Sequence, residues 1–176
     1  MAKFEGFSEI ALLYAEKYEL VEAMRKQFDD ERKALFIALH DKIASQDWYK
    51  PDTVQYKRNQ VIVGLFSDHI GKEILFVRFW WPSESFVANR MFRYRLIIDD
   101  LLLQFKDNFR QQADDFLRQE FSSKEYESLN DLGSISIIFR DVHYETGEIL
   151  ETMFAEIEKL RALLPFAEKA YQQPSS

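Results

Sequence analysis

Residues 60–81 constrain the fold of this chain more than any other segment. QVIVGLF at 60–66 and KEILFVRFWW at 72–81 are rich in β-branched and aromatic residues, and a short polar segment containing Gly71 separates them. Such runs are typical of β-strands, and a glycine-containing loop of about four to six residues joins strands in a hairpin. Pro82 has no backbone N–H with which to continue the pairing. We therefore expect an antiparallel hairpin over 60–81.

Two further segments extend the predicted sheet. Residues 83–98 fit two periods, because apolar residues alternate with Arg93 and Arg95, while Val87, Met91 and Tyr94 also fall on a helical stripe behind a cap at Ser83. Asp99 or Asp100 offers a fresh helix start, so the sequence favours a strand ending at Ile98. SISIIFRDV at 134–142 predicts another strand. The sequence thus predicts a small, mainly antiparallel sheet of three to four strands over about 60–98 and 134–142.

Helical periodicity surrounds this sheet. Apolar residues recur at helical spacing over 8–45, with Ser8 as N-cap, and the stripe lapses near Asp29, so we expect one long helix or two helices meeting there. The imperfect heptads leave open whether this coiled-coil-like segment pairs with a second copy or packs within one chain. Residues 100–121 predict an amphipathic helix, and 147–171 predict a C-terminal helix that Pro165 kinks or restarts.

The resulting order predicts an α+β fold in a single domain over 1–176. The arrangement resembles that of small accessory domains found beside restriction-type nuclease domains, although no motif of the chain carries the likeness.

The chain has a formal charge of −7, no cysteine, no signal-peptide pattern and no apolar run long enough to span a membrane. These features favour an acidic, soluble, cytoplasmic protein.

Several chemistries find no support in the sequence. Five scattered glycines form no phosphate-binding loop, and Ser67 and His69 lie in a turn that we expect to be solvated. Pro51-Asp52 has no matching acid and lysine for a nuclease centre. Asp141, His143 and Glu145 are weak candidates for a metal site, but acids beside a helix start explain them more simply. We expect no cofactor.

The segment RFWWPSESFVANRMFRYR at 78–95 places arginine beside aromatic rings repeatedly. Positive residues exceed acids within 56–95, which carries +4, while the remainder of the chain carries −11. Strand alternation predicts that Arg78 and Trp80 share one face of the hairpin and that Arg93 and Arg95 join them. The opposing interpretation is that the rings are core and the arginine stems only cover their edges. The predicted binding residues are Lys57, Arg58, Arg78, Trp80, Arg90, Arg93 and Arg95.

Three functions follow from these observations. The favoured prediction is a non-enzymatic protein–protein interaction module (a regulator, adaptor, chaperone or inhibitor), with a homodimer through the N-terminal helix as one form. The first alternative is an accessory nucleic-acid-binding domain of a restriction or defence system, which would use the arginine and aromatic residues on phosphates. The second alternative is a metal-dependent enzyme using Asp141, His143 and Glu145.

Overall fold

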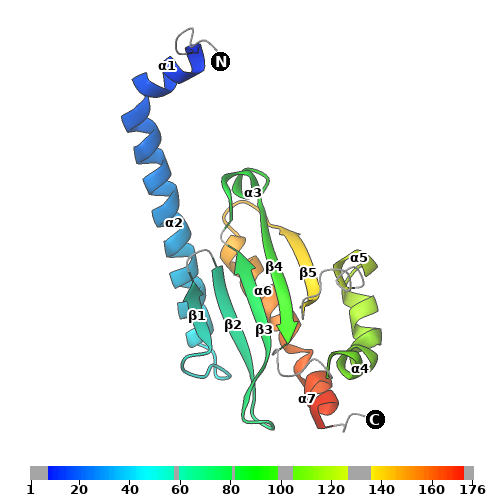
Figure 1. The fold of residues 1–176 in the computed structure, drawn as a ribbon. Coiled ribbons are helices and arrows are strands. Elements are labelled where there is room, and N and C mark those ends of the chain that lie inside the picture. The colour runs from blue at the N-terminus through cyan, green and yellow to red at the C-terminus, as the bar shows by residue number, and fades with distance from the viewer. Residues whose placement is uncertain (1–7, 58–59, 81, 99–104, 127–135, 173–176) are drawn as a thin grey trace, which may run out of the picture. The chain divides into compact units, whose positions relative to one another are not determined.

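The computed structural model describes residues 8–57, 60–80, 82–98, 105–126 and 136–172. It confirms the α+β class, with a long N-terminal helical segment, an antiparallel sheet, a middle helix and a bent C-terminal helix (Figure 1). The chain divides into two units, Met1–Ile37 and Ala38–Ser176, and each is considered by itself. The single domain over 1–176 stays a prediction.

The first unit contains α1 (Glu9–Glu16) and the larger part of α2 (Tyr18–Ala44). Ser8 begins α1 as predicted, because its hydroxyl oxygen accepts a hydrogen bond from the Ala11 N–H at 3.3 Å. Of the two alternatives, the meeting of two helices near Asp29 is wrong, because α2 continues through Asp29 and the break lies at Lys17. Lys17 is neither glycine nor proline, so no residue type marks this break.

The polar residues 29–33 continue α2 instead of ending it. Asp29 pairs with Arg32, and Asp30 pairs with Lys33, so each acid meets a base on the next helical turn. Such pairs at a spacing of three residues support a helix, which explains why the lapse in the apolar stripe does not interrupt it.

The second unit is built on a sheet whose strands follow one another in chain order, each antiparallel to its neighbours. The described strands are β1 (Val54–Lys57), β2 (Gln60–Ser67), β3 (Lys72–Trp80), β4 (Met91–Ile98) and β5 (Ser136–His143). The predicted hairpin, the strand ending at Ile98 and the strand near 134–142 are confirmed. The sequence does not predict β1, because four residues are too few for a clear alternation.

Residues 83–98 use both of the periods that the sequence allows. Ser83 caps the short helix α3 (Glu84–Ala88), and its hydroxyl accepts a hydrogen bond from the Phe86 N–H at 3.4 Å. The chain then turns at Arg90, whose φ of 52° is left-handed, and returns as β4. The cap and the strand alternation were each correct for part of the segment.

Helices cover one face of the sheet. These are the end of α2, whose His40 ring lies 6.0 Å from the Tyr56 ring of β1, and α6 (Ile149–Arg161), whose Glu156 accepts a hydrogen bond from Tyr94 of β4. The third is α7 (Leu164–Gln172), which contacts β2 and β3. The middle helix α4 (Phe105–Glu120) packs against α7, and the short α5 (Ser123–Tyr126) lies beside β5. Figure 1 shows α6 crossing behind β3 and β4. The predicted helix over 100–121 is confirmed from Phe105 onward, and 99–104 lie outside the described residues. The C-terminal helix bends between Arg161 and Leu164, just ahead of Pro165, as predicted.

The core lies between this face and the helices. Alternate strand residues point into it and are buried, as a half-covered sheet requires. A polar network crosses the same layer: the Tyr94 hydroxyl donates to Glu156 at 2.7 Å, and Arg140 pairs with Glu156 at 3.1 Å and with Glu125 at 2.9 Å. The principal buried strand residues are Val61, Val63, Leu75, Val77, Phe79, Phe92, Tyr94, Leu96, Ile138 and Val142.

Candidate binding surface

The face of the sheet opposite the helices carries the arginines. Because side chains alternate along a strand, the buried Val77, Phe79, Tyr94 and Leu96 leave the residues between them on the other face. We call six side chains there, which are half-buried, the arginine–aromatic patch. They are Arg78 and Trp80 of β3, Phe86 of α3, Arg93 and Arg95 of β4, and Phe139 of β5.

Strand register brings these side chains together. Arg78 stands directly opposite Arg95, and Arg95 stands directly opposite Phe139. Arg93 of β4 and Asp141 of β5 lie two positions further along these strands and stand directly opposite each other. Residues directly opposite one another in an antiparallel pair point to the same face, so three neighbouring strands place one row of side chains side by side.

Guanidinium groups and aromatic rings alternate in the patch. The Arg93 guanidinium lies 5.0 Å from the Phe86 ring and 4.8 Å from the Phe139 ring. The Arg95 guanidinium lies 5.0 Å from Phe139 and 5.1 Å from Trp80. Each distance is within the range of a cation–π contact. The rings therefore hold two arginine forks in place, and the arginines in turn cover ring faces.

Arg93 already has an anionic partner. Its Nε donates to Asp141 Oδ1 at 2.5 Å and its Nη2 donates to Asp141 Oδ2 at 2.7 Å. This bidentate hydrogen bond, outweighing the opposing effect of burial, raises the pKa of Arg93. The pair neutralises one positive charge of the patch and shows that its geometry suits a planar oxyanion.

Arg78 and Arg95 have no such partner among the described residues. Neither makes an ion pair there, and the buried Nε atom of each has no hydrogen-bond acceptor. Burial, followed by the positive charges of Arg78 and Arg93, lowers the pKa of Arg95. The patch therefore holds two arginines, each with a buried Nε atom, that make no ion pair with the described part of the chain.

Two hollows flank this cation pair. A pocket of about 340 Å³ is lined by Trp80, Pro82, Ser83, Phe86, Arg93, Arg95 and Phe139. A second, of about 220 Å³, lies on the β1 side of Arg78 and includes Lys57, Gln55, Glu73 and Phe76. The first pocket combines apolar walls with guanidinium groups, as ligand sites commonly do.

Four of the seven predicted binding residues meet in the patch: Arg78, Trp80, Arg93 and Arg95. Lys57 reaches the same face from β1, because its partner Gln60 is in turn paired with Trp80. Arg58 lies outside the described residues.

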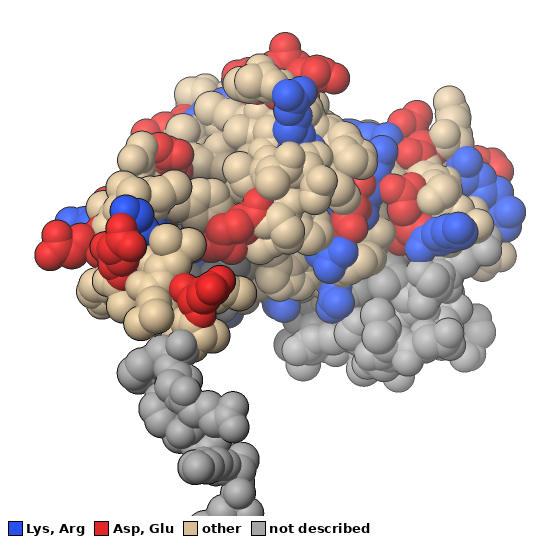
Figure 2. Space-filling model, turned by 90° about the horizontal axis from the view of Figure 1, so that it is seen from above, with Lys and Arg blue, Asp and Glu red and all other residues tan. Residues whose placement is uncertain are grey.

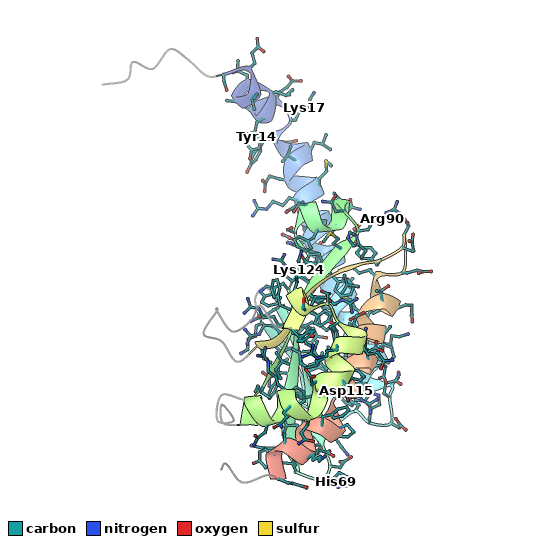
Figure 3. All side chains as sticks on the ribbon, turned by 90° about the vertical axis from the view of Figure 1, so that its right-hand side faces the viewer. Tyr14, Lys17, His69, Arg90, Asp115 and Lys124 are labelled. Atoms are coloured by element: carbon teal, nitrogen blue, oxygen red, sulfur yellow. The ribbon has the colours of Figure 1, made fainter. Side chains whose placement is uncertain are left out.

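Arg90 is the predicted binding residue that the structure separates from the patch. It is exposed at the turn between α3 and β4, and it lines neither hollow. Figure 3 shows Arg90 at the opposite end of this unit from His69 of the β2–β3 turn.

Sequence reasoning missed Phe86 and Phe139 as parts of the surface. The opposing interpretation places Phe86 in the core with the other rings, yet it is only half-buried and lines the pocket. Phe139 alternates with the buried Ile138 in β5, and a correct pairing of β5 with β4 would have placed it beside Arg95. The opposing interpretation is correct for Phe79 and Phe92, which are fully buried. Trp81 lies outside the described residues.

The weak metal candidates do not form a centre. Within the described residues no three His, Asp, Glu or Cys side chains lie close enough to share an ion. Asp141 and His143 do share the patch face of β5, but both Asp141 oxygens bind Arg93.

Ser67 and His69 also have a structural explanation. Ser67 is buried rather than solvated, its hydroxyl donates to Glu168 at 2.6 Å, and it accepts from the Ile70 N–H at 3.1 Å. His69 is exposed and lies 4.0 Å from the same carboxylate. The serine therefore fixes the hairpin turn to α7.

Charge outside the patch is mixed. Figure 2 shows acidic and basic side chains interspersed among neutral ones on the face in view. Over the described residues no helix is both long and apolar enough to cross a membrane.

Neither a protein-family model, nor a curated protein, nor a solved structure matches this chain. The functional interpretation therefore depends on the geometry of the patch.

Proposed function

We propose that this chain is a protein-interaction module whose arginine–aromatic patch binds an acidic segment of a protein partner. One observation carries the proposal: Arg78 and Arg95 lie side by side on one sheet face, are partly desolvated, and have no acid among the described residues to neutralise them. Desolvating an unpaired charge is unfavourable, and an incoming carboxylate would remove that penalty.

The composition of the patch supports the same class of function. Arginine and tryptophan are enriched in the residues that contribute most to protein–protein binding, and arginine recognises carboxylates with its planar fork. Because Trp80 and Phe139 hold the Arg95 guanidinium, less side-chain freedom is lost when a partner binds. The Arg93–Asp141 pair is an example of carboxylate binding within the patch itself.

The nucleic-acid alternative has weaker support. Binding of single strands depends largely on bases stacking on open aromatic faces. Here the aromatic rings line a single pocket of about 340 Å³, the size of a small-ligand site, and not a groove along which successive bases could stack. The chain also carries a net charge of −7, which opposes approach to a polyanion except at the patch.

Binding of a labelled oligoglutamate peptide, followed by fluorescence anisotropy at low and moderate salt, tests the proposal. We expect Arg95→Gln to weaken binding by about tenfold, as the loss of a charge-assisted hydrogen bond implies. Arg90→Gln is the matched control, since it removes the same charge from an exposed position outside the patch, and it should change binding by less than about twofold. Equal weakening by both variants, or tighter binding of labelled single-stranded RNA or DNA, would refute the proposal.

Homodimerisation through the N-terminal helix stays a prediction. The first unit exposes a series of large apolar side chains, including Ile10 at 81% and Met24 at 63%. A molar mass measured by light scattering distinguishes a dimer from a monomer.

A further inference from the structure

The number of uncompensated charges in the patch points to a particular anion. Of the three arginines, Arg93 is neutralised by Asp141, which leaves Arg78 and Arg95. These two stand directly opposite one another on β3 and β4. Like charges in that position repel and destabilise a sheet, so the arrangement is unfavourable until something neutralises both.

One carboxylate supplies a single negative charge and two oxygens. A phosphate monoester carries roughly −1.5 to −2 at neutral pH and has three strong acceptor oxygens. Arginine forks bind phosphate bidentately, and two adjacent forks match one phosphate better than they match one carboxylate. The cation pair therefore fits a dianion.

The pocket beside Arg95 indicates which kind of side chain would carry such a phosphate. Its walls are Trp80, Pro82, Phe86 and Phe139, and its volume of about 340 Å³ lies in the range that holds a small ligand. Pro82 is buried and its ring fixes the backbone φ, so this part of the wall has little conformational freedom. An aromatic stem would pack against these walls, whereas a short aliphatic stem would leave much of the apolar surface uncovered.

We propose that the arginine–aromatic patch binds a phosphorylated tyrosine side chain of the partner protein. The phosphate lies on Arg78 and Arg95, and the ring lies in the pocket formed by Trp80, Phe86 and Phe139. This inference rests on the proposed function, because it specifies which anionic group of the partner the patch recognises. Phosphorylation of the partner would then control binding.

Four labelled peptides of one otherwise identical sequence test this inference on the full chain. Their central residue is tyrosine, phosphotyrosine, glutamate or phosphoserine, and their affinities are compared by anisotropy. We expect the phosphotyrosine peptide to bind about tenfold more tightly than the glutamate peptide and more tightly than the phosphoserine peptide. Arg78→Gln and Arg95→Gln should each remove the gain from phosphorylation, and Arg90→Gln should preserve it.

The other outcomes separate the two proposals. If the acidic peptides bind but phosphotyrosine gives no gain, the phosphotyrosine site is refuted and the acidic-segment module stands. If none of the peptides binds, both fail. If adenosine monophosphate or a short RNA binds more tightly than the phosphotyrosine peptide, the ligand is a nucleotide and the inference is wrong. The comparison among peptides uses the unmodified protein, so it remains decisive even if a variant fails to fold.

Discussion

Replacing Arg93 by methionine should destabilise the fold much more than replacing Arg95 by methionine, although the two residues lie two positions apart on the same face of β4. Methionine keeps an unbranched apolar side chain against the rings and removes only the guanidinium group. Arg93 would lose its bidentate bond to Asp141, in which the side chains are 38% and 32% exposed, together with contacts to two rings. A half-exposed ion pair contributes about 1 kcal/mol and each ring contact about 0.5 kcal/mol, so Arg93→Met should destabilise the fold by about 2 kcal/mol.

Arg95 has the same two ring contacts but the opposite electrostatic environment. Its neighbours on the sheet are the cations Arg78 and Arg93, and both lower its pKa in addition to the effect of burial. Losing the ring contacts costs about 1 kcal/mol. Relief of repulsion from a directly opposite like charge returns about 0.2 to 1 kcal/mol, and removing a desolvated charge returns more. Arg95→Met should therefore leave the free energy of unfolding within about 0.5 kcal/mol of the original value.

Urea unfolding of the original chain and both variants, followed by circular dichroism at low ionic strength, measures this difference. Added neutral salt should stabilise the original chain more than Arg95→Met, because it screens a repulsion that the variant lacks. If Arg95→Met costs as much as Arg93→Met, then Arg95 stabilises the fold, and the argument that it is held ready for a partner is wrong.

Four further predictions concern the scaffold. Tyr94→Phe removes the hydroxyl that donates to Glu156 and should lower the free energy of unfolding by about 1.5 to 2 kcal/mol, whereas a loss below about 0.5 kcal/mol would show that the buried bond contributes little. Burial raises the pKa of Tyr94, so its contribution to stability is complete below pH ~10 and is lost as the pH rises further. The free energy of unfolding should therefore fall between neutral and alkaline pH, and it should fall less steeply in Tyr94→Phe. Gly71 has a φ of 80°, so Gly71→Ala should lower the free energy of unfolding by about 1 kcal/mol. Arg90 has a left-handed φ, so Arg90→Gly should relieve backbone strain and raise the free energy of unfolding by about 0.5 kcal/mol. Thermal unfolding measures both changes, and opposite signs would contradict the backbone argument.

Much of the fold could be predicted because local signals agree with the tertiary structure. The β-branched runs around Gly71, the caps at Ser8 and Ser83, and Pro165 each determine a local boundary that packing does not override. Features that no local residue pattern marks could not be predicted from the sequence. The break at Lys17 has no residue type to mark it, and β1 is too short to show an alternation.

The candidate surface was predictable only within a single strand or hairpin. Alternation places Arg78 with Trp80 along β3 and Arg93 with Arg95 along β4, and the apolar residues between them identify the outward face of each strand. The contributions of Phe139 and Asp141 depend on the register of β5, and the bonded residues Arg93 and Asp141 are 48 positions apart in the chain. No local pattern specifies that register. The sequence therefore could not predict that Arg93 pairs with an acid while Arg95 does not.

The side-chain Nε–H signals of the arginines, followed by nuclear magnetic resonance during titration with the oligoglutamate peptide, test the central claim most directly. Binding at the patch predicts that the signals of Arg78 and Arg95 shift in a saturable way while that of Arg90 stays in place. Shifts confined to Arg90, or uniform small shifts of all arginines that disappear at moderate salt, would contradict a specific acidic-partner site on this face of the sheet.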